Sequence, residues 1–237
     1  MYMSNAKYKQ IEEHFIQLIE SGALKYGDQI KTEEQLCQEF GCSRMTVNKA
    51  MNDLNQRGYI TRAPGKGSFV RIPSVAKSSA SIASFTEDME KIGMKAGSKL
   101  LSYNVISASE VPEIRDKLQL TNNDMIHYII RLRTGNGIPF AISYGYISAK
   151  IIPAIDISSL NSSFYAYLDE IGIPRLSKEM EITACIPDDF QKEHLEISNT
   201  ALLCATHLTY TLFENEVKPF EYIKTYYNGD RYTYTTD

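Results

Sequence analysis

The chain has 237 residues, of which 43% are hydrophobic and 23% are charged, a balance typical of a globular protein with one or two buried cores. No apolar run approaches the ~18 residues that cross a bilayer, and the N-terminal stretch MYMSNAKYKQIEEHF has no apolar signal core, so we expect a cytoplasmic protein with no membrane partner. The four cysteines lack CxxC spacing and the four histidines lack HxxxH spacing, so the sequence predicts free thiols, no metal site and no cofactor.

The formal net charge of −4 is unevenly distributed along the chain. Residues 1–72 hold ten Lys or Arg against eight Asp or Glu, and residues 44–71 alone hold six against one. A basic segment in an acidic chain favours a localised anionic partner over general adhesion to nucleic acid. The alternative is a solvated charged face without a partner.

Three helices are predicted in the first 60 residues. Residues 6–21 carry apolar side chains at helical spacing, and a capping box over residues 32–35 opens a second helix that ends at Gly41. Residues 43–58 form the third helix, with Ser43 as its cap. Two short helices joined by a tight turn are typical of a helix-turn-helix. The predicted core residues of the three helices are Ile11, Phe15, Leu18, Ile19, Leu36, Phe40, Val47, Met51 and Leu54.

Polar side chains crowd the first turn of the third helix. A helix-turn-helix inserts this end of its third helix into the DNA major groove. Arg44 can donate two hydrogen bonds to a guanine, and Asn48 can pair with an adenine. Thr46 can contact a thymine methyl or a phosphate, and Lys49 a phosphate.

Two short strands over residues 59–62 and 68–71 flank a glycine-rich tip and predict a β-hairpin, or wing. The tip lacks the GxxxxGK[ST] spacing of a nucleotide-binding loop, and we expect it to reach the adjacent minor groove. The predicted DNA-binding residues are Ser43, Arg44, Thr46, Asn48, Lys49, Gly65, Lys66 and Gly67.

The composition changes after the wing. Residues 73–81, PSVAKSSAS, are predicted to be a linker between a DNA-binding domain of residues 1–72 and a second domain of residues 82–237. The second domain alternates β-branched and aromatic runs with short helical stretches, which predicts an α+β fold around a mainly antiparallel sheet. The predicted strands are 100–106, 125–134, 140–147, 180–186, 202–213 and 220–227, and the predicted helices are 84–92, 112–118, 163–171 and 190–195.

Arg131 and Arg133 stand two residues apart on a predicted strand, so their side chains share one face. Two adjacent guanidinium groups repel each other unless an anion lies between them, and their planar forks suit phosphate or carboxylate. The sequence leaves two interpretations open: an anion-binding site, or a surface face paired with acidic neighbours.

The N-terminal segment carries a series of short motifs: YKQI (8–11), GxL (22–24), TExxL (32–36), FGCSRxTV (40–47), LxxxG (54–58) and GKGSFV (65–70). In these motifs it resembles the GntR superfamily of bacterial transcription regulators over nearly all of residues 7–71. Two departures are Lys31, where a proline is usual, and Asn48, where an arginine is common.

The second domain carries the motifs SFT (84–86), GMK (93–95), RLR (131–133), GIPFA (137–141), SFYAYL (163–168) and EYIKTYY (221–227). In these motifs, residues 80–237 resemble the effector-binding domain of the HutC subfamily, called UTRA, which has a chorismate-lyase-like fold. Resemblance to the members that sense phosphorylated sugars, such as N-acetylglucosamine-utilisation repressors, implies a phosphate site. Ser143 departs from the glutamate usual in the family. The residues implied for the phosphate are Arg131, Arg133, Ser163, Tyr165 and the backbone N–H groups of Phe85 and Thr86, and those implied for the sugar are Glu221 and Tyr227.

The resemblance therefore implies a homodimeric transcription repressor that binds double-stranded operator DNA and is released by a small phosphorylated metabolite, in particular a sugar phosphate. The alternative is a HutC-type regulator of a non-phosphorylated carboxylate such as urocanate. A remote alternative is a lyase-like enzyme, but the sequence has no Ser-His-Asp or Cys-His arrangement, and we expect no enzymatic activity. A non-specific architectural DNA binder would leave the second domain without a role.

Overall fold

The computed structural model describes residues 6–25, 27–71, 74–176 apart from 79–83, and 178–235. The chain divides into two compact units, Met1–Ser74 and Val75–Asp237. No helix among the described residues combines the length and the apolar character needed to cross a membrane.

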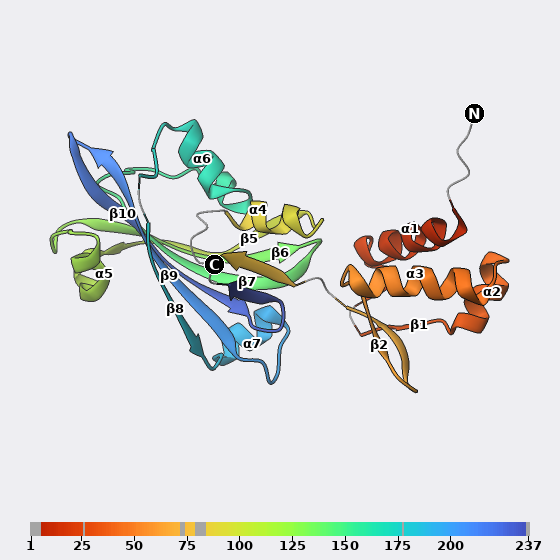
Figure 1. Ribbon diagram of the computed structural model, residues 1–237. Helices are drawn as coiled ribbons and strands as arrows, with labels where there is room; N and C mark the ends of the chain where they lie inside the picture. Colours follow the sequence, from red (N-terminus) through yellow and green to blue (C-terminus); the bar gives the residue numbers. More distant parts are fainter. Residues whose placement is uncertain (1–5, 26, 72–73, 79–83, 177, 236–237) are drawn as a thin grey trace, which may run out of the picture. The chain divides into compact units, whose positions relative to one another are not determined.

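The first unit is a winged helix-turn-helix (Figure 1). Its helices are α1 (Lys7–Glu20), α2 (Glu33–Phe40) and α3 (Arg44–Gln56), and its strands are β1 (Gln29–Ile30), β2 (Ile60–Ala63) and β3 (Gly67–Val70). The strands form an antiparallel sheet in the order β1-β3-β2. The three predicted helices and the wing are confirmed, and β1, which is two residues long, was not predicted.

The local signals act as expected in this unit. The Thr32 side chain accepts from Gln35 N–H to cap α2, and the Ser43 side chain accepts from Thr46 N–H to cap α3. Gly41 ends α2 in the left-handed region at φ 56°, which turns the chain into α3. The core consists of Ile11, Phe15, Ile19, Ile30, Leu36, Val47, Ala50, Met51, Leu54, Ile60 and Val70. Leu18 and Phe40, predicted as core, are only partly buried against it.

The second unit is built on a six-stranded antiparallel sheet in the order β5-β6-β7-β10-β9-β8, which confirms the α+β prediction. The strands of this sheet are β5 (Ala96–Ser107), β6 (Met125–Gly135), β7 (Ile138–Ser148), β8 (Lys178–Cys185), β9 (Leu202–Phe213) and β10 (Glu216–Asn228). The unit also contains β4 (Val75–Ser78) and β11 (Tyr232–Thr235), which form a separate two-stranded sheet. Its α-helices are α4 (Phe85–Lys91), α5 (Pro112–Lys117), α6 (Phe164–Glu170) and α7 (Asp189–Leu195).

The helices cover both faces of this sheet (Figure 1). α6 packs with Ile129 and Ile147 on one face, whereas α5 and α7 pack with Ile126 and Ile142 on the other. The strand register places Arg131 opposite Ser143, and Ser143 opposite Thr225, in a row across β6, β7 and β10. Because side chains alternate along a strand, this row lies on the face that carries α6.

Part of the predicted linker is a β-strand. Residue 73 and residues 79–81 lie outside the described part of the chain, but Val75–Ser78 forms β4, which pairs in parallel with β11. Val75 and Lys77 are buried, and Lys77 Nζ lies 2.6 Å from a carboxylate oxygen of Asp88 in α4. The prediction failed here because a Ser- and Ala-rich stretch has little hydrophobic pattern of its own, and its partner strand is at the other end of the domain.

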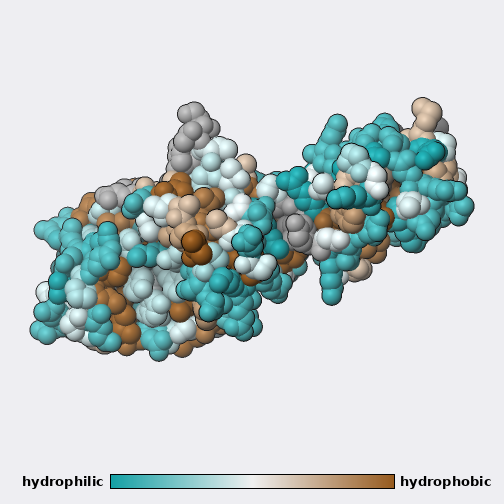
Figure 2. Space-filling view, turned by 90° about the horizontal axis from the view of Figure 1, so that it is seen from below, coloured by the Kyte–Doolittle hydropathy of each residue, from teal (hydrophilic) through white to brown (hydrophobic). Residues whose placement is uncertain are grey.

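Hydrophilic residues cover most of the first unit in the view of Figure 2, whereas hydrophobic residues reach the surface of the second unit in several places. Among the described residues of the first unit, Met45 is the only large hydrophobic residue in the exposed class, with 85% of its surface accessible.

Candidate functional site

The first turn of α3 presents Arg44 and Met45 to solvent. The Arg44 side chain is 81% exposed, and its nearest acidic contact is Glu33, 3.6 Å from Nε. Ser43 and Thr46 are instead engaged with each other, because their hydroxyls share a hydrogen bond of 2.9 Å. Met45 was not among the predicted contact residues, although its position between Arg44 and Thr46 could have suggested it.

Asn48 and Lys49 already have intramolecular partners. Asn48 Nδ2 donates to Glu33 Oε1 at 3.0 Å, and Asn48 Oδ1 accepts from Asn52 Nδ2 at 3.0 Å. Lys49 Nζ lies 3.8 Å from the centre of the Tyr8 ring, a cation–π contact. Both side chains are therefore held in place by contacts within the first unit.

The wing tip is an exposed turn with a tight base. Gly67 has φ 114°, and a Cβ there would lie 2.7 Å from Gln29 Nε2, so a larger residue would be strained and crowded. Gln29 Nε2 donates to the Lys66 carbonyl at 3.1 Å, which ties the tip to β1. The Lys66 side chain is exposed, as are Gly65 and Gly67.

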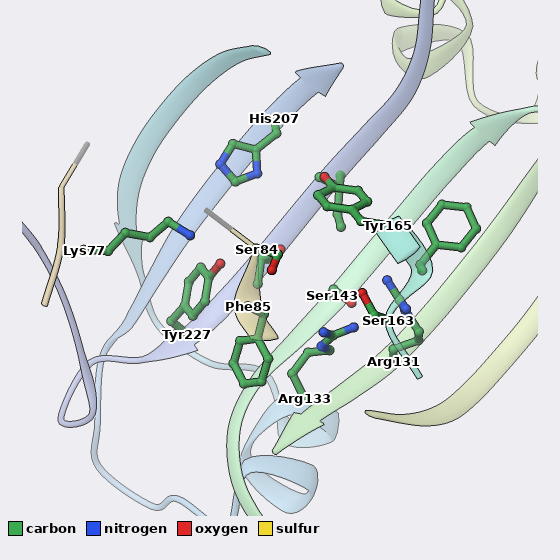
Figure 3. Close-up of a pocket in the computed structure, with 13 residues that line it drawn as sticks. Lys77, Ser84, Phe85, Arg131, Arg133, Ser143, Ser163, Tyr165, His207 and Tyr227 are labelled. Atoms are coloured by element: carbon green, nitrogen blue, oxygen red, sulfur yellow. The ribbon is translucent and has the colours of Figure 1, made fainter. Parts of the chain in front are cut away.

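A pocket lies in the second unit between the sheet, α4 and the start of α6 (Figure 3). It contains about 590 Å³ of empty space, part of which is open to solvent. Arg131 and Arg133 lie on one side, and Lys77, Tyr227 and His207 lie on the other. The pocket is lined by Lys77, Ser84, Phe85, Arg131, Arg133, Ser143, Ser163, Phe164, Tyr165, His207, Ile223, Thr225 and Tyr227.

Six of the eight predicted effector residues line this pocket, and Thr86 and Glu221 do not. Thr86 follows Phe85 in the first turn of α4. Glu221 is 1% exposed and accepts hydrogen bonds from Tyr165 OH at 3.1 Å and Thr209 Oγ1 at 3.0 Å. Strand alternation from Tyr227 could have identified Thr225 and Ile223, whereas no sequence signal pointed to Lys77.

Arg131 and Arg133 are both buried in the wall of this pocket. Their residues are 7% and 8% exposed, and within the described part of the chain neither guanidinium has a carboxylate at salt-bridge distance. Arg131 Nη1 and Arg133 Nε are buried without a hydrogen-bond acceptor. The guanidinium carbon of Arg131 lies 5.5 Å from the Phe164 ring centre, and that of Arg133 lies 4.9 Å from the Phe85 ring centre.

Burial is also the main influence on the protonation of these groups. It lowers the pKa of Arg131 to about 9, an effect that Arg133 reinforces and Glu221 opposes, and it lowers the pKa of Arg133. Burial raises the pKa of Tyr165, with Glu221 adding to the effect, and raises the pKa of Tyr227 to about 12. At neutral pH the pocket therefore has a cationic Arg131 guanidinium and two neutral phenols, of which Tyr165 already donates its proton to Glu221.

No group of three or more His, Cys, Asp or Glu that could hold a metal occurs among the described residues. The buried His127 ring makes two hydrogen bonds: Nδ1 lies 2.9 Å from Tyr103 OH, and Nε2 lies 2.8 Å from the Ile152 carbonyl. Since a carbonyl only accepts, the Nε2 proton points to Ile152, and His127 is a satisfied structural residue.

Comparisons with known proteins agree with this two-unit arrangement. Residues 7–70 match the model described as "Bacterial regulatory proteins, gntR family", and residues 91–233 match that of the UTRA domain. The chain is 32% identical to the HTH-type transcriptional repressor NagR of Bacillus subtilis over 96% of the chain and 92% of the relative. It is 27% identical to the mannosyl-D-glycerate transport/metabolism system repressor MngR of Escherichia coli, over 96% and 94%. The solved structure of PhnF from Mycobacterium smegmatis has the same fold, with a TM-score of 0.70 at 21% identity over 97% of each chain.

Proposed function

This chain belongs to the GntR family of bacterial regulatory proteins and carries a UTRA domain, and from that membership we propose that it is a homodimeric transcription repressor released from operator DNA by a small phosphorylated metabolite. The DNA would be read by α3 and the wing, and the metabolite would be held in the pocket of the second unit. Such a repressor works in the cytoplasm, where the chromosome lies.

The observation that carries the effector proposal is the pair of buried guanidinium groups, neither of which has a carboxylate at salt-bridge distance among the residues that the structure describes. Removing a charge from water costs several kcal/mol unless an opposite charge offsets it. Two cations side by side, Arg131 and Arg133, add mutual repulsion. An anionic ligand between the two forks would relieve both costs.

The groups around the arginines favour phosphate over carboxylate. Ser163 Oγ caps α6 by accepting from Ala166 N–H at 3.3 Å, which leaves its own proton free to be donated to a ligand. Phosphate offers more acceptor oxygens than a carboxylate, so it can use both forks and the neighbouring hydroxyl. The backbone N–H groups of Phe85 and Thr86 would add donors at the pocket edge.

The remainder of the pocket suits a polyhydroxylated ligand. Ser143, Thr225 and Tyr227 offer hydroxyls, and Phe85 and Phe164 offer ring faces. MngR acts in the metabolism of a sugar derivative, which supports a sugar-related effector here. Its name also contains a carboxylate, glycerate, and a carboxylate effector is the second candidate function. Glu221, which does not line the pocket, would position Tyr165 rather than contact the sugar.

Release from DNA requires that the ligand bind one conformation of the dimer more tightly than the other. We propose that the ligand-bound dimer holds its two DNA-binding units at a spacing that does not match the two half-sites of the operator. A ligand with equal affinity for both conformations would leave the equilibrium between them unchanged, however tightly it bound.

The test combines isothermal titration with DNA retardation on the full chain. Glucose 6-phosphate, other sugar phosphates, their neutral sugars, gluconate and urocanate are titrated, and we expect binding only where a phosphate is present. Arg133→Ala should abolish binding and leave DNA retardation in ligand-free buffer unchanged, because Arg133 lies outside the first unit. Arg115→Ala is the matched control, since Arg115 lies on α5 on the opposite face of the sheet. Tight binding of gluconate or urocanate that survives in the Arg133 variant would refute the phosphate proposal.

A further inference from the structure

Glu33, the first residue of α2, joins three parts of the first unit through one carboxylate. Its Oε1 accepts hydrogen bonds from Asn48 Nδ2 at 3.0 Å and from Arg62 Nη2 at 2.5 Å. Its Oε2 lies 3.6 Å from Arg44 Nε. Asn48 and Arg44 belong to α3, and Arg62 belongs to β2 of the wing. The carboxylate therefore contacts both elements proposed to read DNA.

We propose that Glu33 is a positioning residue for DNA recognition, which orients the Asn48 amide for base reading and holds the wing against α3. This inference rests on the proposed DNA-binding role of α3 and the wing. The four side chains involved form a closed ring of hydrogen bonds, Glu33–Asn48–Asn52–Arg62, because Arg62 Nη1 also donates to Asn52 Oδ1 at 2.5 Å.

The ring determines which way the Asn48 amide faces. A carboxylate only accepts, so the Asn48 nitrogen must face Glu33, and the Asn48 oxygen accepts from Asn52. One N–H and one lone pair of the amide remain. These are the two groups that a bidentate contact with adenine needs. Without Glu33 the amide could rotate and lose this orientation.

The same ring fixes the wing strand before DNA binds. Arg62 bridges α2 and α3, because it donates one hydrogen bond to the Glu33 carboxylate and another to the amide oxygen of Asn52. The bond to the carboxylate joins two opposite charges, which strengthens it. A reading surface that is already ordered loses less conformational entropy when it binds. Glu33 thus links α3 and the wing into one surface that is already ordered before DNA binds.

A simpler role for Glu33 makes a different prediction. If Glu33 were only a negative charge beside the DNA, its removal would strengthen binding to every sequence alike, because repulsion from phosphates would fall. If Glu33 positions Asn48, its removal must weaken the preference for one base pair. Base preference therefore separates the two roles, and overall affinity alone does not.

The experiment uses the full chain and a site selected by the wild-type protein from a random pool of double-stranded DNA. Dissociation constants are measured for that site and for each single base-pair substitution. We expect Glu33→Ala to reduce discrimination at one base pair about tenfold, the same base pair that Asn48→Ala affects. Asn48→Ala should cost no further discrimination when Glu33 is already alanine, because interacting residues are not additive. Glu33→Gln, which keeps an acceptor oxygen, should retain part of the discrimination.

Glu34→Ala is the matched control, since Glu34 is the exposed next residue of α2 with the same charge. It should change affinity for all sequences alike and leave base preference intact. The proposal is overturned if Glu33→Ala behaves like Glu34→Ala, or if its thermal stability falls while base preference is kept. If the wild-type chain selects no sequence from the pool, the proposed DNA-binding function fails instead.

Discussion

The side chains at the start of α3 differ in how much freedom they keep. Arg44 is largely exposed and only loosely attracted to Glu33, whereas Lys49 lies on the Tyr8 ring and Asn48 is held at both ends of its amide. A free, long, charged side chain can reach a guanine edge, and a side chain fixed against the protein contributes a set position. On this basis we propose separate roles in DNA recognition for these neighbouring residues.

Arg44→Ala should cost on the order of 1–3 kcal/mol of binding free energy and relax preference at one operator position, because it removes the proposed bidentate base contact. Lys49→Ala should weaken binding to all sequences and flatten the salt dependence, because it removes the proposed phosphate contact. Retardation assays over a series of salt concentrations measure both. Unchanged base preference in the Arg44 variant would contradict its assignment as a base reader.

Binding of a phosphorylated effector should depend on pH in a way that the buried arginines determine. Arg131 attracts an anion only while protonated, so affinity should fall as pH rises through about 9, the pKa of Arg131 in the pocket. Affinity should also fall below about 6, where a phosphate monoester gains its second proton. Titration calorimetry between pH 5 and pH 10 measures this, with circular dichroism as the control for an intact fold. Constant affinity up to pH 10 would show that Arg131 does not hold the anion.

At the scale of elements, β4 is the least expected part of the second unit. It brings Lys77 into the pocket wall and ties it to α4 through Asp88, which also accepts a hydrogen bond from Tyr232 of β11. The Lys77 and Asp88 side chains are 3% and 1% exposed. One buried ion pair thus holds together a strand, a helix and the final strand of the domain.

Asp88→Ala should destabilise the second unit by about 3–5 kcal/mol, because it leaves the Lys77 charge buried without its carboxylate. Urea unfolding of the full chain, followed by tyrosine fluorescence, measures the loss. The double variant Lys77→Met, Asp88→Leu should lose much less free energy of unfolding, since it removes both charges of the buried pair. A cost below about 1 kcal/mol for Asp88→Ala would mean that the pair is not a stabilising element.

At the scale of the whole molecule, the proposed function needs a two-fold axis. One third helix and one wing make few contacts, and helix-turn-helix proteins bind paired half-sites as dimers. The second unit has its own core and sheet and is the proposed site of dimerisation. Effector and operator should then oppose each other by equal factors, since coupling between two binding sites is reciprocal.

A fragment of residues 75–237 should sediment as a dimer at micromolar concentration, without the first unit. The fragment starts at 75 because β4 belongs to this unit, and a fragment that starts at residue 80 should be less stable, because it lacks Lys77 and the partner of β11. Analytical ultracentrifugation and thermal unfolding of both fragments check this. A monomeric 75–237 fragment would place the dimer contacts elsewhere.

The sequence by itself determined the local elements of this protein. Capping boxes, glycine stops and apolar periodicity act over a few residues, so the three N-terminal helices, the wing and the strands of the large sheet could be predicted within a few residues of their ends. Strand alternation was enough to place Arg131 and Arg133 on one face, and six of the eight predicted effector residues line one pocket.

Only the tertiary structure decided which of these residues are free and which are already engaged. Three contacts join residues from separate elements. β4 pairs with β11, Glu221 accepts hydrogen bonds from Tyr165 and Thr209, and Glu33 accepts a hydrogen bond from Asn48. No local pattern encodes such contacts, because they depend on where the chain returns after a long excursion. For the same reason the sequence placed Arg131 and Arg133 on one face of a strand, and the fold showed that both are buried with no carboxylate at salt-bridge distance in the described part of the chain.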